Sequence, residues 1–261
     1  MLKSLRLISR TRGLFYMSKF ILSDFLGNQL GFPMDGHKKE LLFWEKQIVG
    51  LGNFSRKFPD RVDRSRQKNM FPKYLLQFIE SLKIRNDNQV ISVLDVGAGP
   101  VSLLTWAHHQ GLIKLTTSDI LSKEYLELLI IYGRAESVEG ILVKPSPAEQ
   151  LANILGAEKF HMVFCNNALD HMDSPILALL QMVEVAIPGG IVVISGHSRE
   201  GTKENWDGIH NHDLYIENRK LMRSGREGKS VHVADNMNLE TIHVEAAKDK
   251  CGDMVIVYRK N

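Results

Sequence analysis

The stretch VLDVGAGP, residues 93–100, predicts a buried strand that ends in a glycine turn. Gly97 and Gly99 allow the chain to turn tightly, and they let a ligand approach the backbone where a side chain would block it. The residues that follow, VSLLTWAHHQ, have a helical pattern, and the first N–H groups of a helix have no partner within it. Strand, turn and helix therefore favour a nucleoside-binding site, with a glycine turn that binds nothing as the alternative.

The order of strand then helix continues after this turn. Each predicted strand is a nearly continuous apolar run, which is typical of a parallel sheet buried on both faces and connected by right-handed crossovers. Strands are predicted at residues 89–96, 114–120, 139–145, 160–167 and 189–198. Residues 239–249 and 251–260 have no helix between them and predict a hairpin. The predicted fold class is α/β: a Rossmann-like, doubly wound sheet, mostly parallel with an antiparallel last strand, plus an N-terminal helical cap.

Composition divides the chain into a main domain with additions. The main domain is predicted at 89–261, with a polar, irregular insertion at about 198–238, and residues 24–88 predict a helical cap or lid. Residues 1–23 form a basic N-terminal extension with five basic residues and no acidic one. This extension favours a membrane-surface helix or an organelle transit peptide, and the alternative is a plain extension upstream of Met17.

The overall composition excludes several classes of protein. Of the 261 residues, 44% are hydrophobic and 24% charged, the ordinary balance of a soluble globular protein. A net charge of +3 is too small to favour nucleic acid as a partner. Cys165 and Cys251 lie far apart and form no CxxC pair, which favours a reducing compartment. We expect a cytoplasmic protein, or one at a membrane surface or in an organelle if the basic extension directs it there.

An acidic residue follows the second predicted strand. Asp119, 22 residues after Gly97, is placed to accept hydrogen bonds from both ribose hydroxyls, or alternatively to cap the next helix. A dinucleotide fingerprint needs a third glycine where this chain has Ser102. Asp95 would repel a pyrophosphate but suits a cationic ligand such as an ammonium or a sulfonium. An NAD(P)-dependent oxidoreductase is therefore the less favoured alternative.

Several segments together resemble a known family. VLDVGAGP, TTSDIL, FHMVFCNNALDH and the final hairpin are similar to the class I S-adenosylmethionine-dependent methyltransferases over about residues 89–261. NNALDHMDSP with PGGIVVISGHSREGTKENWDGIH resembles small-molecule and glycan methyltransferases of types 11 and 12. The resemblance implies S-adenosylmethionine as the cofactor, bound by Asp95, Gly97, Ala98, Gly99, Asp119, Ile120, Ala148, Glu149, Asn166 and Asn167.

The resemblance also implies a role for some of these residues. Asp95 would hold the ammonium end of the cofactor, Asp119 would bind the ribose, and the backbone N–H of Ala148 would face the adenine. Pro147 departs from the family, whose members often carry at this place an aspartate that contacts the adenine amine.

The segment CNNALDHMD, residues 165–173, predicts the chemical end of the site. Ligands of a parallel sheet lie beyond the carboxyl ends of the strands, where this segment would meet the glycine turn. His171 is the predicted general base, Asp170 would orient it or act as base, and His210 from the insertion would join them. Alternatively, Asp170 or Asp173 caps the following helix, and His171 is a helix-start residue that bonds a neighbouring loop. The expected acceptor is a small-molecule or glycan hydroxyl, and a non-catalytic, cofactor-binding partner subunit is a further alternative.

The acceptor pocket is predicted from less specific signals. His197, Trp206 and Trp44 are candidate substrate-binding residues. Seven basic and two acidic residues between Arg56 and Lys73 favour an anionic acceptor, unless they form a solvated face. The sequence leaves the oligomeric state open.

A metal is not expected. His197, His210 and His212 could suggest one, but neither a cysteine nor an HExxH motif accompanies them.

Overall fold

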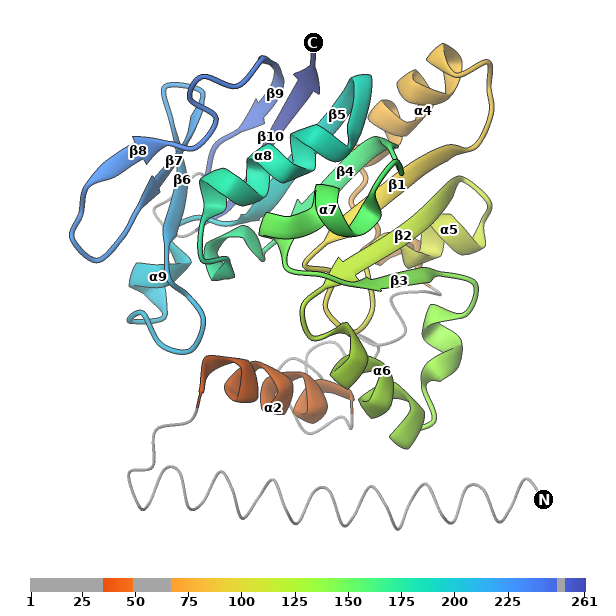
Figure 1. Cartoon of the computed structure of the whole chain (residues 1–261), viewed down its shortest axis with the longest axis horizontal. Coiled ribbons are helices and arrows are strands. Elements are labelled where there is room, and N and C mark those ends of the chain that lie inside the picture. Colours follow the sequence, from red (N-terminus) through yellow and green to blue (C-terminus); the bar gives the residue numbers. More distant parts are fainter. Residues whose placement is uncertain (1–34, 49–66, 248–251) are drawn as a thin grey trace.

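A computed structural model describes residues 35–48, 67–247 and 252–261 (Figure 1). Its centre is a seven-stranded sheet in the order β3-β2-β1-β4-β5-β10-β9. The strands of this sheet are β1 (Ile91–Val96), β2 (Ile113–Asp119), β3 (Leu142–Pro145), β4 (Phe160–Asn166), β5 (Ala186–His197), β9 (Leu239–Glu245) and β10 (Asp253–Lys260). β1 to β5 are parallel, and β10 lies antiparallel between β5 and β9. The predicted α/β sheet with its antiparallel last strand is confirmed.

The strand order reverses at β1, which pairs with β2 on one side and with β4 on the other. A reversal of this kind leaves a crevice beyond the carboxyl ends of the two central strands. Asp95 of β1 lies beside Thr117 of β2 and Phe164 of β4, so the three strands end close together. The residues that follow β1, β2 and β4 therefore meet at one edge of the sheet.

Helices cover both faces of the sheet (Figure 1). On one face α8 packs on the strands through Met182, which shares a core cluster with Val163 of β4. On the other face α4 and α5 pack through residues such as Ile79, which shares a second cluster with Val93 of β1. The helices are α2 (Gly36–Ile48), α4 (Leu75–Arg85), α5 (Thr105–His109), α6 (Ser122–Ile131), α7 (Leu151–Leu155), α8 (Pro175–Val185) and α9 (Glu200–Lys203), with short 3-10 turns η2 (Lys68–Met70), η3 (Ala135–Val138), η4 (Ala148–Gln150) and η5 (Leu169–His171). This burial on both faces explains the continuous apolar strands.

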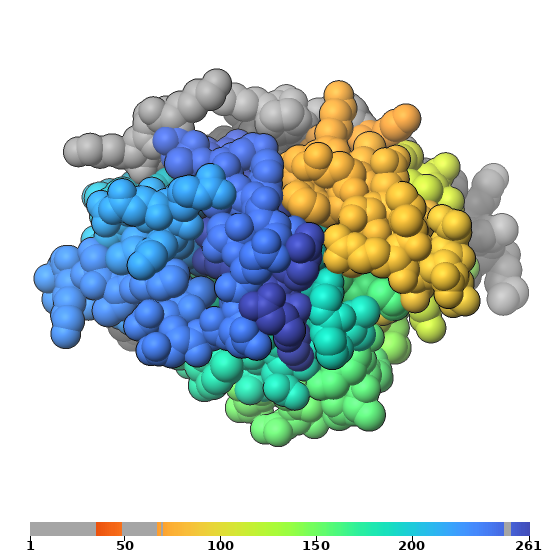
Figure 2. Space-filling model, turned by 90° about the horizontal axis from the view of Figure 1, so that it is seen from above, coloured from red at the N-terminus to blue at the C-terminus, as the bar shows by residue number. Residues whose placement is uncertain are grey.

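The insertion after β5 is more regular than its polar sequence predicts. Helix α9 is followed by an antiparallel sheet of β6 (Asp213–Glu217), β7 (Lys220–Ser224) and β8 (Ser230–His232). Leu214 and Leu221 are buried and join the core cluster of α8. In Figure 2 the insertion and the last two strands fill one side of the molecule, and the segment with α4 fills the other. A few apolar anchors fix this small sheet, too few to give a periodic signal in the sequence.

Helix α2 lies beyond the carboxyl edge of the sheet, between α9 and α6 (Figure 1). The ammonium of Lys39 lies 2.6 Å from a carboxylate oxygen of Asp207 in the insertion. At the other end, the hydroxyl of Tyr132, just after α6, donates to Glu45 at 2.5 Å. Helix α2 therefore connects the insertion to α6 across the edge where the strands end.

The predicted cap or lid at 24–88 is described only in part, and its role as a lid stays a prediction. Helix α4 packs on a sheet face, and α2 alone among the described residues lies over the strand ends. The basic extension 1–23 and most of the basic run between Arg56 and Lys73 fall outside the described residues. Within the part of the chain that the structure describes, no helix has the length and apolar character to cross a bilayer.

Candidate active site

The glycine turn after β1 is pressed between the tips of β2 and β4. Gly97 and Gly99 have φ angles of +70° and +63°, which residues with a side chain rarely adopt. The backbone N–H groups of Gly97 and Ala98 both point at the carbonyl of Ser118, at 2.7 and 3.3 Å. A Cβ on Gly97 would lie 2.4 Å from the Cβ of Ala168, beyond the tip of β4. Glycine is required here by both the backbone angle and the close approach.

Asp119 at the tip of β2 holds the turn in place. Its carboxylate accepts hydrogen bonds from the N–H of Gly99 at 3.0 Å and from that of Leu121 at 2.8 Å. Leu121 is the N-cap residue of α6 and no side chain caps this helix, so the alternative that Asp119 caps it is wrong. Burial raises the pKa of Asp119, and the charge of Glu40 adds to this, while the two N–H bonds and the charge of His171 oppose it. A buried carboxylate with a raised pKa gains from further donors, which two ribose hydroxyls would supply.

Asp95 is buried at the end of β1 and is bonded to Ser102. The hydroxyl of Ser102 donates to the Asp95 carboxylate at 2.5 Å and accepts from the N–H of Leu104 at 2.9 Å. The serine in place of the third glycine therefore positions the carboxylate. Tyr74 lies nearby: burial raises its pKa to about 12, a hydrogen bond with Ser195 opposes this, and the charge of Asp95 contributes to the rise.

The predicted adenine residues lie close to the tip of β2. Ala148 is buried in η4 directly after Pro147, whereas the side chain of Ile120 is 51% exposed. Ile120 directly follows Asp119, and its predicted contact with the cofactor stays a prediction. Glu149 accepts a hydrogen bond from the backbone N–H of Ser174 at 3.1 Å, so the structure gives it a bracing contact with the start of α8.

Asn166 and Asn167 join the tip of β4 to that of β5. The side-chain oxygen of Asn166 accepts from the hydroxyl of Ser195 at 2.9 Å, and that of Asn167 accepts from the N–H of His197 at 3.0 Å. Asn167 also has a φ of +52°, which turns the chain sharply after the strand. Each of these side-chain oxygens accepts one hydrogen bond within the protein and keeps a second lone pair for a ligand.

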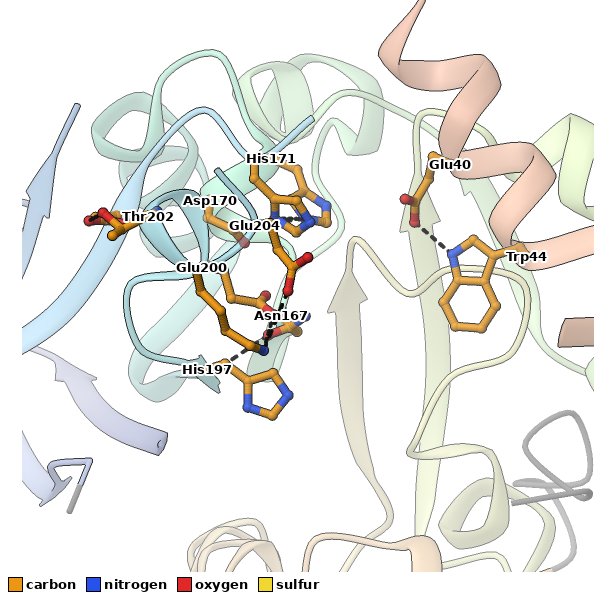
Figure 3. A network of polar contacts seen from close by, with 12 residues as sticks. Glu40, Trp44, Asn167, Asp170, His171, His197, Glu200, Thr202 and Glu204 are labelled. Atoms are coloured by element: carbon orange, nitrogen blue, oxygen red, sulfur yellow. Dashed lines mark hydrogen bonds and ion pairs between the residues drawn. The ribbon is translucent and has the colours of Figure 1, made fainter. Parts of the chain in front are cut away.

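Asp170, His171 and His210, the three predicted catalytic residues, meet in space, and Figure 3 labels Asp170 and His171 among the polar contacts around them. We call them the Asp–His–His cluster. The Nδ1 atom of His210 lies 2.8 Å from Oδ2 of Asp170 and 3.1 Å from Nε2 of His171, and this Nε2 lies 3.4 Å from the same oxygen. The backbone N–H of Asn211 donates to the carbonyl of Asp170 at 3.1 Å, which holds the insertion against η5. Ser174 caps α8 through its side chain, so the alternative that Asp170 caps this helix is wrong.

The Asp–His–His cluster is mostly buried, and acidic residues lie around it. Burial by itself raises the pKa of Asp170, but the charge of His171 and the hydrogen bond from His210 outweigh it and hold that pKa below its usual value. Burial alone would lower the pKa of His210, yet its bond to Asp170 and the charges of Glu200 and Glu204 raise it. The side chains of the Asp–His–His cluster can accept a proton from a bound ligand, or they can bind a cation.

The predicted acceptor-side residues lie apart from this cluster. The Nδ1 atom of His197 pairs with Asp253 of β10 at 2.5 Å. The ring of Trp206 packs on Gly201, where a Cβ would lie 2.8 Å away, and its carbonyl accepts from Arg226 at 2.8 Å. Both contacts tie these residues to the insertion and the sheet, and their predicted substrate contacts remain predictions.

The considered histidine cluster does not form. His212 is buried and its Nε2 faces the carbonyl of Asp173 at 3.3 Å, while His197 is paired elsewhere. Within the described residues, His210 instead groups with Asp170 and His171. His210 and His212 are only two positions apart in the sequence, yet they lie in different surroundings.

Helix α2 supplies two residues on the opposite side of the site. The ring of Trp44 packs on the glycine turn, because a Cβ on Gly99 would lie 3.3 Å from its Cζ2 atom. Its Nε1 donates to Glu40 at 2.7 Å, and Figure 3 shows both side chains across from Asp170. Trp44, predicted to bind substrate, therefore lies at the cofactor turn. Sequence reasoning missed Glu40 and Tyr74, because neither stands in a motif.

Comparison with known proteins agrees with this geometry. Residues 94–194 match the family model of a methyltransferase domain. Similar solved structures include magnesium protoporphyrin IX methyltransferase (ChlM) from Synechocystis PCC 6803, with 14% identity, 93% of this chain and 97% of that chain covered, and a TM-score of 0.48. An S-adenosylmethionine-dependent methyltransferase from Clostridium acetobutylicum has 11% identity, 80% and 98% coverage and a TM-score of 0.48. The N-methyltransferase NodS from Bradyrhizobium japonicum WM9 has 13% identity, 70% and 84% coverage and a TM-score of 0.46.

No curated protein sequence matches the chain. The match to the methyltransferase model confirms the resemblance in the sequence and decides against the nicotinamide-dependent alternative. Residues 94–194, within a sheet in the order β3-β2-β1-β4-β5-β10-β9, therefore form a class I S-adenosylmethionine-dependent methyltransferase domain.

Proposed function

We propose that the protein methylates a hydroxyl group of a small-molecule or glycan acceptor. The observation that carries this proposal is the meeting of Asp170, His171 and His210 beside the glycine turn. A hydroxyl is a poor nucleophile until it loses its proton, whereas a neutral amine attacks without that step. A buried cluster that can take a proton is therefore of more use for oxygen than for nitrogen.

The residues of the strand tips fit the cofactor. S-Adenosylmethionine supplies an electrophilic methyl group on a sulfonium. The buried carboxylate of Asp119 offers its remaining acceptor sites to the ribose, and Ile120 offers an exposed apolar surface to the adenine. The turn at Gly97 and Gly99 brings backbone close to the ligand, and Asp95 contributes negative charge at the methionine end.

The chain's own residues would then align and deprotonate the acceptor. The cluster lies at the tip of β4, and the charge of His171 is close enough to Asp119 to affect its pKa. A hydroxyl held at the cluster would give up its proton there, form a bond to the methyl carbon, and leave the carbon–sulfur electron pair on sulfur. Alignment of this kind accounts for much of the rate of a bimolecular transfer.

A binding measurement followed by an acceptor screen tests the proposal. A ligand present at 100 times its dissociation constant stabilises the folded protein by about 2.7 kcal/mol, so S-adenosylhomocysteine should raise the melting temperature while NADH should not. A screen with radiolabelled cofactor would then compare matched hydroxyl and amine acceptors, anionic ones first. O-Methylated products support the proposal. Methylation of amines alone, or cofactor binding with no turnover across both series, would contradict it.

A further inference from the structure

The three side chains of the Asp–His–His cluster direct their ligand atoms at one point. Their separations are 2.8, 3.1 and 3.4 Å. Among the residues that the structure describes, this is the group of histidine, cysteine and acidic side chains whose ligand atoms all lie within 4.8 Å of one another. The two rings are inclined at 74° with centroids 4.5 Å apart, so they are not stacked.

A single proton on His210 cannot serve both of the contacts that its Nδ1 atom makes. An imidazole nitrogen has a single position in the ring plane, either an N–H or a lone pair. Nδ1 of His210 nevertheless faces two partners, Oδ2 of Asp170 and Nε2 of His171, at hydrogen-bond distance. One proton on Nδ1 can be directed at only one of them. A cation at the common point would interact with all three atoms.

We propose that Asp170, His171 and His210 bind a divalent transition-metal ion. A triangle with the three measured sides has a circumscribed radius of about 1.8 Å, shorter than the roughly 2.0–2.2 Å of zinc–nitrogen and zinc–oxygen bonds. A single ion can therefore lie at bonding distance from all three atoms, slightly outside their plane. The spacing of the three atoms is therefore compatible with one shared ion.

The surroundings of the cluster favour positive charge. Glu200 is only 6% exposed, and its Oε2 atom has no hydrogen-bond partner among the described residues. The charges of Glu200 and Glu204 both act on His210. The neighbouring cation is Lys203, 3.6 Å from each of the two glutamates. Counting Asp170, three carboxylates face one ammonium, so an added cation would reduce the imbalance.

The donor set limits the identity of the ion. Two imidazole nitrogens and one carboxylate suit zinc, iron(II) or cobalt(II), whereas magnesium and calcium prefer oxygen ligands. Three protein ligands also leave positions open, as in catalytic sites that bind water or substrate.

The metal would hold the acceptor hydroxyl in a defined position for methyl transfer. This part of the inference rests on the proposed function. A hydroxyl bound to the ion loses its proton to solvent more readily, because the cation stabilises the oxygen anion. The oxygen then forms the bond to the methyl carbon, and sulfur keeps the electron pair of the broken bond. With the ion bound, Asp170 and the two histidines would promote the loss of the same proton by holding the metal, and solvent would take the place of the cluster as the proton acceptor.

Cobalt(II) binding tests the site without relying on activity. The full chain, prepared without a histidine tag and stripped with a chelator, is titrated with Co²⁺ while its visible absorption is recorded. We expect one ion per chain, and His210→Ala and Asp170→Asn should weaken binding by more than about 100-fold. The matched control is His232→Ala in the same insertion, a partly exposed histidine 3.8 Å from Asp235, which should leave binding unchanged.

The melting temperature of each variant is measured with and without S-adenosylhomocysteine, which shows whether a variant that no longer binds metal is still folded. His210→Gln provides a second, less disruptive substitution. Saturation at one Co²⁺, lost in the cluster variants that still bind the homocysteine compound, supports the metal site. A chain that binds S-adenosylhomocysteine and methylates a hydroxyl but takes up no Co²⁺ overturns the metal and leaves the proposed function standing. Co²⁺ binding unaffected by the cluster variants also overturns it. Co²⁺ uptake at the cluster without cofactor binding would reject the proposed function alone.

Discussion

The site has a cofactor half, with Asp119 and the glycine turn, and an acceptor half, with the Asp–His–His cluster. The side chain of Asp119 bonds backbone groups close to it in the sequence, whereas the side chain of Asp170 bonds that of His210, 40 residues away. Asp119 accepts from the N–H of Gly99 and Leu121, all within the first two strands and their turns. Asp170 instead contacts His210, which lies in the insertion. The first half is fixed by the sheet itself, and the second depends on how the insertion docks. We therefore expect substitutions in the two halves to separate cofactor binding from turnover.

The largest effect should come from Asp170→Asn. The amide keeps the shape of the side chain but can neither accept a proton nor bind a cation in the same way, so turnover should fall by about 10²- to 10⁴-fold. Affinity for S-adenosylhomocysteine should stay within about twofold, because Asp119 and the glycine turn are untouched. Steady-state kinetics and calorimetry measure the two quantities. Asp173→Asn, an exposed residue of the same turn, is the matched control. Full activity in Asp170→Asn would remove the acceptor half from the catalytic site.

Gly97→Ala should disrupt the cofactor half as a structure. Its Cβ would lie 2.4 Å from that of Ala168, and its φ is +70°. Overpacking and backbone strain together should lower the free energy of unfolding by about 2–5 kcal/mol.

Gly111→Ala separates the two causes. Gly111 has nearly the same φ, +68°, but nothing within 4 Å of a Cβ, so this substitution should lower the free energy of unfolding by only about 1–2 kcal/mol. Urea unfolding of both variants gives the comparison. Equal losses would mean that the contact with Ala168 is not important.

Asp119→Asn should weaken S-adenosylhomocysteine binding by about 10- to 100-fold, the usual effect of losing hydrogen bonds to a charged group. Glu124→Gln removes one negative charge from the exposed start of the next helix and should leave the affinity nearly unchanged. A similar loss in both variants would indicate a general charge effect instead of a contact with the ribose.

The same residue predicts a pH dependence. Burial raises the pKa of Asp119, with Glu40 adding to the rise and His171 opposing it. Ribose hydroxyls donate to the ionised form, so affinity should be complete above the raised pKa and should be lost as the pH falls through it, at a higher pH than an ordinary aspartate would give. Calorimetry across mildly acid pH would show this loss in the natural protein, and a flatter profile in Asp119→Asn. An identical profile in the variant would assign the dependence to another group.

The smallest effect is expected for the ion pair between Lys39 of α2 and Asp207 of the insertion. The Lys39–Asp207 pair is short, but its side chains are 41% and 72% exposed, so Lys39→Gln should change KM by less than about fivefold. The change should shrink at high salt, where exposed pairs are screened. Lys38→Gln, at the exposed neighbouring position, is the control. A much larger effect would mean that this ion pair determines the position of the cap.

The sequence by itself determined the sheet's strands, the glycine turn, Asp119 and the candidate pair Asp170 and His171. Each of these rests on local physics: strands buried on both faces are apolar throughout, a tight turn needs positive φ, and polar side chains follow the strand tips. The first strand and turn, residues 89–100, could therefore be assigned before any contact was known.

Only the tertiary structure decided what meets across the site. Nothing local orders β10 between β5 and β9 or places Trp44 on Gly99, and the predicted meeting of His210 with Asp170 depends on how the insertion packs. Glu40 and Tyr74 likewise gain their positions from the packing of α2 and of the segment before α4. Contacts between distant segments depend on which surfaces pack together, and that depends on the whole chain and not on the spacing of residues within one segment.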